Sequence, residues 1–181
     1  MKQIFKICAV LTSICAICAF LLALTHNAAI GKIEENQKKA IQESINKLAP
    51  KTTRQEKIKV NNTLLWKLYK DNALIGYAAI ASGQGYGGEI EIMTVTGPKL
   101  EKIKGIEIIK SNETPGLGSK ISQKPFKAQF ENLDVTTPIT YSKTEPKKPG
   151  QIQTITGATI SSKSVVEILN KKIKALRVNI Q

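Results

Sequence analysis

Histidine is almost missing from this chain, and cysteine is missing from most of it. The single histidine, His26, lies at the edge of the first apolar segment, and all three cysteines, Cys8, Cys15 and Cys18, lie inside it. These absences argue against a Ser-His-Asp triad, a Cys-His dyad or a histidine-rich metal site. They also leave no thiol for a disulfide in the rest of the chain. We therefore expect no metal and no thiol chemistry.

Acidic and aromatic residues are also scarce. The chain has 27 Lys and Arg residues against 14 Asp and Glu residues, a net charge of +13, and only 5% of its residues are aromatic. The positive charge suits an anionic partner, such as a phosphate-bearing cofactor, a lipid surface or nucleic acid. A nucleic-acid binder would be expected to place aromatic side chains among the basic ones, and this pattern is missing. We expect no nucleic-acid partner.

One long stretch, from Ile7 to Thr25, carries no charge. At about 1.5 Å per residue a helix of this length nearly spans the hydrocarbon core of a bilayer. Lys2 and Lys6 precede it, which favours a cytoplasmic N-terminus. We expect a cytoplasmic segment 1–6, a transmembrane anchor 7–25 in the cell (inner) membrane, and an extracytoplasmic, periplasmic remainder. A cleaved signal peptide is the alternative, although no A-x-A-like cleavage site follows the apolar core.

The next segment has helical spacing of its apolar residues and ends at a proline. We expect a stalk helix over 26–50, ended by Pro50, then a basic linker over 51–62 and a globular domain over 63–181. In that domain, strand-like runs bounded by turn residues cover Leu64–Tyr69, Leu74–Ser82, Glu89–Thr96, Ile103–Lys110, Pro138–Ser142 and Gln151–Ile155.

Two helices are expected in the domain. Pro125–Asn132 is a candidate short helix, and the C-terminal helix is expected to begin near Ser161 or Ser162. Strands in series with helices beside them predict an α+β fold with a mixed, largely antiparallel sheet.

A first loop motif, Gly83–Gly88, matches G-x-G-x-x-G. A dinucleotide site would need a helix next, but the following EIEIMTV alternates like a strand, so that interpretation fails. Two interpretations remain. The segment is a glycine-rich hairpin, or a loop without side chains that lets the backbone approach a flat ligand.

The second motif is ETPGLG, residues 113–118. Pro115-Gly116 is the pairing that a type II turn requires, because proline sets φ at one central position and glycine supplies a positive φ at the next. Taken alone, the motif is either a plain turn or part of a site.

The third motif is TGAT, residues 156–159, followed by Ile160, Ser161 and Ser162. Small hydroxylated residues at a helix start are good caps, and Ser164 with Glu167 has capping-box spacing. The same geometry would suit an anionic phosphate, which the free N–H groups and the helix dipole stabilise. Lys163 adds positive charge nearby.

Together and in this order, GYGG, ETPGLG and TGATISS resemble the FMN-binding domain shared by two kinds of membrane protein. These are the G subunit of Rnf-type electron-transport complexes and the C subunit of sodium-pumping NADH:quinone oxidoreductases. The wording ETPGLGSKI and TGATISSK favours the Rnf protein. The resemblance implies a redox subunit that works with other membrane subunits to move electrons between ferredoxin and NAD, coupled to ion translocation.

In that family a flavin transferase moves FMN from FAD onto the last hydroxyl residue of [ST]-G-A-[TS], as a phosphoester. The resemblance places this covalent FMN on Thr159. It also implies that the domain 63–181 binds FMN, and that the chain has no catalytic residue of its own. The other implied cofactor-binding residues are Thr156, Gly157, Ala158, Tyr86, and, around the isoalloxazine, Glu113, Thr114, Leu117 and Gly118.

One position departs from the family pattern. The family has an aspartate three residues before the motif's first hydroxyl residue, and this chain has Gln153. This difference keeps open a scaffold domain of the same fold without flavin. A second alternative is an FMN carrier that serves another extracytoplasmic redox system.

Overall fold

The structure is a computed structural model that describes residues 1–60 and 63–180. The chain divides into two compact units, Met1–Ala40 and Ile41–Gln181. The first unit belongs to one helix, α1 (Lys2–Leu48), which continues into the second unit. Side chains 1–39 are exposed, and α1 contains a stretch that is long and apolar enough to cross a membrane. Among the described residues no other helix has this property.

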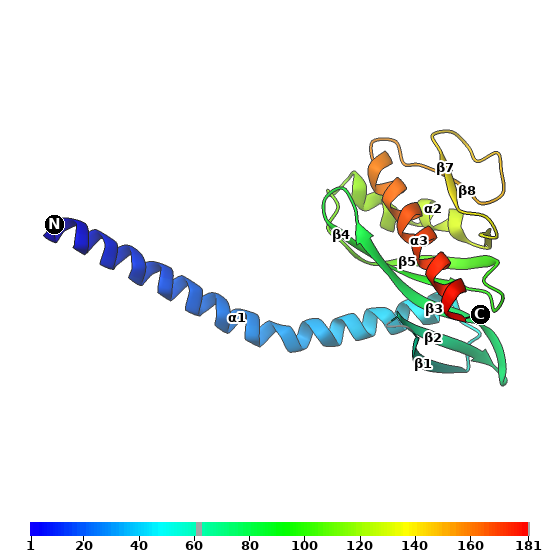
Figure 1. Cartoon of the computed structure of the whole chain (residues 1–181), viewed down its shortest axis with the longest axis horizontal. Coiled ribbons are helices and arrows are strands. Elements are labelled where there is room, and N and C mark those ends of the chain that lie inside the picture. The colour runs from blue at the N-terminus through cyan, green and yellow to red at the C-terminus, as the bar shows by residue number, and fades with distance from the viewer. Residues whose placement is uncertain (61–62, 181) are drawn as a thin grey trace. The chain divides into compact units, whose positions relative to one another are not determined.

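The second unit contains a six-stranded antiparallel sheet whose strands are ordered as in the sequence (Figure 1). Its strands are β1 (Arg54–Val60), β2 (Thr63–Lys70), β3 (Ala73–Gln84), β4 (Glu89–Thr96), β5 (Lys102–Ser111) and β6 (Leu133–Asp134). A separate parallel pair consists of β7 (Thr140–Ser142) and β8 (Gln151–Gln153). The predicted α+β fold with a largely antiparallel sheet is confirmed.

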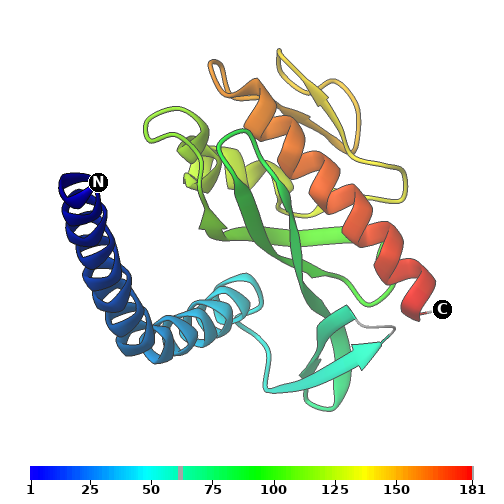
Figure 2. The same cartoon turned by 60° about the vertical axis from the view of Figure 1, so that its left-hand side comes forward.

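Helices lie beside this sheet, as predicted. They are the 3₁₀ helix η1 (Gly118–Ser122), α2 (Lys124–Lys127), the 3₁₀ helix η2 (Ala128–Phe130) and α3 (Thr159–Ile180). Figure 2 shows α3 lying along one face of the sheet. The predicted stop before Pro50 is confirmed, because α1 ends at Leu48.

Alternation along β4 explains how both faces of the sheet are buried. Ile90 and Ile92 belong to the core cluster that includes the buried side of α3. Met93 and Val95 belong to a different cluster, which includes Ile45 near the end of α1. Since successive side chains of a strand point to opposite faces, the last turns of α1 cover the face that α3 leaves open.

Two sequence-based expectations are wrong. The basic linker 51–62 contains the strand β1, which pairs with β2 along its whole length. The apolar pattern of RQEKIKV is weak because β1 is an edge strand, and edge strands commonly carry charged side chains. Asn61 and Asn62 lie outside the described residues. The C-terminal helix begins at Thr159, before Ser161, so Ser164 and Glu167 lie inside α3 and form no capping box.

A group of charged side chains joins the end of α1 to β5 and α2. The Glu107 carboxylate lies 2.8 Å from Lys47 Nζ and also pairs with Lys127 Nζ. The side chains of Glu107 and Lys127 are only 18% and 14% exposed. Burial by itself raises the pKa of Glu107. Hydrogen bonds from the Lys127 and Lys47 ammonium groups lower it by more, so the pKa lies below its usual value.

Glu107→Gln is therefore expected to lower the free energy of unfolding by about 1.5–3 kcal/mol at neutral pH, the range for hydrogen bonds to charged groups. The pKa of Glu107 is lower in the folded protein than in the unfolded chain. The stabilisation by its carboxylate is therefore complete at pH values above the unfolded-state pKa, and it is lost as the pH falls through the folded-state pKa. Urea unfolding at pH 7 and pH 3 measures this, with the exposed Glu101→Gln as control. An equal difference between wild type and Glu107→Gln at both pH values would contradict the assignment.

Candidate functional site

The three loop motifs meet at one hollow of about 420 Å³. Its lining residues come from the β3–β4 hairpin, the loop after β5 and the start of α3: Tyr86, Glu113, Thr114, Leu117, Gly118, Gly157, Ala158, Thr159, Ile160 and Ser161. Every predicted site residue except Thr156 lies on this lining. Thr156 is exposed just before it. Sequence reasoning missed Ile160 and Ser161 as lining residues, although both follow the TGAT motif directly.

The Pro115-Gly116 turn has the predicted type II geometry. The Leu117 N–H donates to the Thr114 carbonyl oxygen at 3.2 Å, and Gly116 has φ +77°. The Gly116 N–H also donates to Ser119 Oγ at 3.0 Å, which holds the turn against η1. The turn places Leu117 on the lining of the hollow with its side chain half exposed.

The start of α3 supplies free hydrogen-bond donors. Ser162 N–H donates to the Ala158 carbonyl at 3.0 Å, the first bond of helical spacing. In the part of the chain that the structure describes, the N–H groups of Thr159, Ile160 and Ser161 have no protein acceptor. Such unpaired amides and the positive end of the helix dipole favour an anion. Lys163 lies on the same helix face as Thr159, and its Nζ is 5.3 Å from the Tyr141 ring centroid.

Glu113 joins the three parts of the site. Its side chain is buried, with the residue 6% exposed. Oε1 accepts a hydrogen bond from the Gly87 N–H at 3.1 Å, and Oε2 accepts one from Ser161 Oγ at 2.5 Å. Gly87 belongs to the β3–β4 hairpin and Ser161 to the first turn of α3. We call Glu113, Gly87 and Ser161 the Glu113 junction.

Glycines of the first two motifs leave room for the side chains of the Glu113 junction. A Cβ on Gly85 would lie 2.1 Å from Glu113 Oε1, and a Cβ on Gly118 would lie 2.3 Å from Oε2 and 2.7 Å from Ser161 Oγ. Real Cβ atoms do not approach so closely, so a side chain at either position would displace the carboxylate from the place it has here. The first motif forms the turn of a hairpin, since Gln84 pairs with Glu89. Tyr86 of the same turn lines the hollow, and the interpretation as a loop that faces a ligand stays a prediction. Gly85 makes room for Glu113, a role that the sequence did not indicate.

The hollow has an apolar rim. Tyr86, Leu117 and Ile160 are 70%, 49% and 55% exposed, and each comes from a different one of the three segments. Apolar side chains of this size can pack against a flat aromatic ring. With the unpaired amides and the Thr159 hydroxyl on the same lining, the residues present fit a phosphorylated aromatic group such as FMN.

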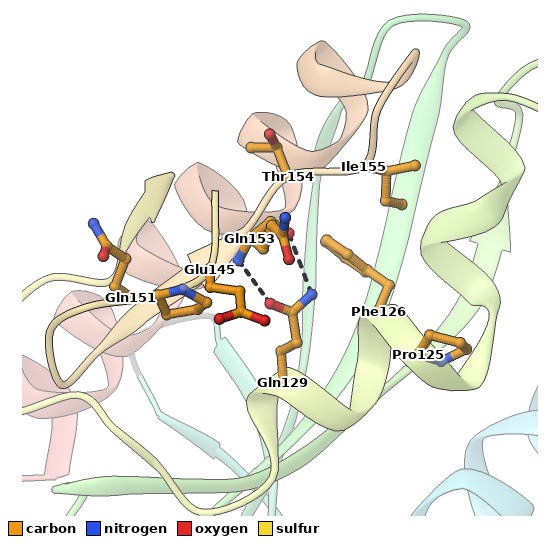
Figure 3. Close-up of a pocket in the computed structure, with 9 residues that line it drawn as sticks. Pro125, Phe126, Gln129, Glu145, Gln151, Gln153, Thr154 and Ile155 are labelled. Carbon is orange, nitrogen blue, oxygen red and sulfur yellow. Dashed lines mark hydrogen bonds between the residues drawn. The ribbon is translucent and has the colours of Figure 1, made fainter. Parts of the chain in front are cut away.

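A larger and more open hollow, of about 620 Å³, lies beside β8 (Figure 3). The Gln129 side chain pairs there with the Gln153 backbone, accepting from its N–H at 2.6 Å and donating to its carbonyl at 3.2 Å. The Gln153 side chain donates to the Lys143 carbonyl at 3.3 Å, which an aspartate could not do. This hollow contains none of the predicted site residues. We assign the site to the smaller hollow, where the three motifs meet.

Gly118→Ala is expected to lower the free energy of unfolding by about 1–3 kcal/mol, because its Cβ would overlap the Glu113 carboxylate and Ser161 Oγ. The matched control is Gly97→Ala, whose Cβ would meet nothing closer than the Lys102 carbonyl oxygen at 4.0 Å. The control should change stability by no more than about 0.5 kcal/mol. Thermal unfolding of the full chain in detergent measures both. Equal stability of the two variants would contradict the tight packing around Glu113.

The chain is similar to known proteins both in sequence and in fold. Residues 85–174 match the model of the FMN-binding domain. Two relatives cover almost the whole chain. The G subunit of the ion-translocating oxidoreductase complex of Methanosarcina acetivorans is 31% identical over 95% of this chain and 94% of its own length. The G subunit of the Na⁺-translocating ferredoxin:NAD⁺ oxidoreductase complex of Acetobacterium woodii is 33% identical over 96% and 91%.

A solved structure shares the fold. The C subunit of the Na⁺-translocating NADH-quinone reductase of Parabacteroides distasonis superposes with a TM-score of 0.66 at 19% identity, over 83% of this chain and 94% of that one. The family predicted from the three motifs is confirmed by the two relatives. This chain belongs to the family of G subunits of ion-translocating, Rnf-type oxidoreductase complexes, and its residues 85–174 match an FMN-binding domain.

Proposed function

We propose that this chain is a membrane-anchored electron-transfer subunit that carries FMN as a phosphoester on Thr159. The complex it serves would move electrons between ferredoxin and NAD and couple this to ion translocation. One observation carries the proposal. The Thr159 hydroxyl belongs to the first residue of α3, on the lining of the hollow where the ETPGLG loop and the β3–β4 hairpin also meet.

The names of the relatives support the proposed complex. The Acetobacterium woodii relative is a subunit of a Na⁺-translocating ferredoxin:NAD⁺ oxidoreductase complex, and the Clostridium ljungdahlii relative belongs to a proton-translocating one. The partners proposed for this chain are therefore the other subunits of such a complex. A flavin transferase is a further proposed partner, needed once for maturation.

Attachment would be a phosphoryl transfer, in which the FMN part of FAD moves to Thr159. Thr159 Oγ would form a bond to the FMN phosphorus of FAD, AMP would leave, and the hydroxyl proton would pass to solvent or to a base of the transferase. The unpaired N–H groups of Thr159, Ile160 and Ser161 would then stabilise the phosphate charge, together with Lys163. Bound FMN supplies the electron-transfer chemistry, and the chain positions it.

The side chains on the rim have a separate task. Tyr86, Leu117 and Ile160 would pack against the isoalloxazine and exclude water from part of it. Their exposure leaves the mouth of the hollow open toward a neighbouring redox partner. An open mouth suits a carrier that must pass electrons on to another centre.

A covalent bond suits the proposed location. We propose that α1 crosses the inner membrane once, with the N-terminus in the cytoplasm and the globular domain in the periplasm. No FMN pool would replace a lost cofactor there, and even tight non-covalent complexes dissociate in time. The phosphoester would prevent that loss.

A scaffold domain without flavin is the second candidate. The specific observation in its favour is Gln153, which stands where the family has an aspartate. Its side chain bonds to the Lys143 carbonyl and lies on the other hollow. If a carboxylate at this position were required by the transferase, the chain would stay unmodified.

Thr159→Ala is expected to abolish covalent flavin, because alanine has no oxygen to form the ester. The fold should survive, since loss of a hydroxyl at a helix start costs about 1 kcal/mol. Thr156→Ala is the matched control. It removes a similar hydroxyl three residues earlier, outside the hollow, and should retain the modification at least in part. The measurement is intact mass after co-expression with a matched flavin transferase. Flavin mass on Thr159→Ala would overturn the residue assignment.

The topology has its own test. A reporter that is active only in the periplasm should be active when fused behind the last residue, because Lys2 and Lys6 favour a cytoplasmic N-terminus before a single crossing. A reporter active only in the cytoplasm should be silent at the same position. The opposite pattern would contradict the proposed orientation and remove the reason for a covalent bond.

A further inference from the structure

The Glu113 junction keeps an acidic side chain away from water. The residue Glu113 is 6% exposed, and a buried carboxylate is unfavourable unless its oxygens are hydrogen-bonded. Both oxygens accept hydrogen bonds here, from the Gly87 N–H and from Ser161 Oγ. The bond from Ser161 Oγ, at 2.5 Å, is the shorter of the two, and the bond from the Gly87 N–H is 3.1 Å long.

In the part of the chain that the structure describes, this carboxylate has no ion-pair partner. Among residues 1–60 and 63–180, no Lys or Arg nitrogen forms an ion pair with Glu113, although the chain has 27 such residues. Hydrogen bonds from neutral groups leave the net charge of the carboxylate in place. The charge therefore acts on whatever occupies the hollow, which Glu113 lines.

The packing shows that the surroundings are built for this carboxylate. Gly85 and Gly118 leave space for its two oxygens, and a methyl group at either position would overlap one of them. If the Glu113 side chain only filled space, an apolar side chain could replace it, and the two positions beside it would not need to be glycine. The arrangement retains an acidic group on the lining of a site whose proposed ligand is itself anionic.

We propose that Glu113 is a positioning residue that joins the three site segments, and that its negative charge lowers the reduction potential of the flavin. The second half rests on the function proposed above. Two-electron reduction of an oxidised flavin with uptake of one proton leaves one additional negative charge on the ring. The electrons come from the donor protein of the complex or, in a titration, from a chemical reductant. A nearby carboxylate disfavours that charge, because like charges repel.

Glu113→Gln separates charge from geometry. A glutamine oxygen can still accept from the Gly87 N–H, and its amide can donate to Ser161 Oγ, but the charge is gone. We expect the reduction equilibrium of the bound flavin to shift toward the reduced form by about tenfold, which is about 30 mV for a two-electron couple. Glu145→Gln is the charge-matched control, because Glu145 is exposed and lines the other hollow (Figure 3). It should leave the potential unchanged.

The experiment uses the full chain in detergent, with flavin attached by the transferase, and titrates wild type, Glu113→Gln and Glu145→Gln with a reductant and mediators. A higher midpoint potential in Glu113→Gln alone supports the proposed charge effect. A midpoint equal to that of wild type in folded, flavin-bearing Glu113→Gln overturns it. So does an equal shift in Glu145→Gln, which would make the effect one of net charge.

Hydrogen exchange of the peptide containing Gly87 tests the junction without flavin. Wild type and Glu113→Gln should protect this peptide, and Ser161→Ala should protect it less because one side of the junction is lost. Equal protection in wild type and a folded Glu113→Ala variant would overturn the positioning role. Absence of flavin from wild type would refute the proposed function and the charge effect with it, while the exchange experiment still decides the positioning role.

Discussion

The Glu113 carboxylate lies where three segments that are distant in the sequence come together. Its two partners, Gly87 and Ser161, are 26 and 48 residues away along the chain. Burial makes this carboxylate unfavourable unless both oxygens are bonded, so the hairpin, the loop after β5 and the start of α3 must hold their mutual positions. The same constraint requires glycine at positions 85 and 118. The shape of the hollow depends on the hydrogen bonds of this carboxylate, because the lining of the hollow comes from those three segments.

Local patterns predict much of this fold. The strands β2 to β5 correspond to strand-like runs bounded by turn residues, and the Pro115-Gly116 turn has the positive φ that its glycine favours. The edge strand β1 escapes prediction because its charged side chains hide the alternation. The predicted start of α3 is too late because Thr159, its first residue, belongs to a motif of small residues that is equally typical of a loop.

Most residues of the site can be predicted from the sequence, but the contacts between them cannot. The motifs and the family resemblance indicate most residues that line the hollow, but they include Thr156, which lies outside it, and miss Ile160 and Ser161. Neither can indicate that a glycine in one motif makes room for a glutamate in another, because such a contact is set by tertiary packing. Gln153 shows the same limit. Its side chain bonds to the Lys143 carbonyl in a different hollow, a role that its place shortly before the TGAT motif does not suggest.

The central claim is a covalent bond between FMN and one hydroxyl at the start of α3. The most direct measurement is peptide mapping by mass spectrometry of wild-type protein purified from membranes that contain an active, matched flavin transferase. We predict the added mass of FMN on the segment 151–163, with fragment ions that place it on Thr159. The same peptide found unmodified, or modified at another hydroxyl residue, would contradict the account.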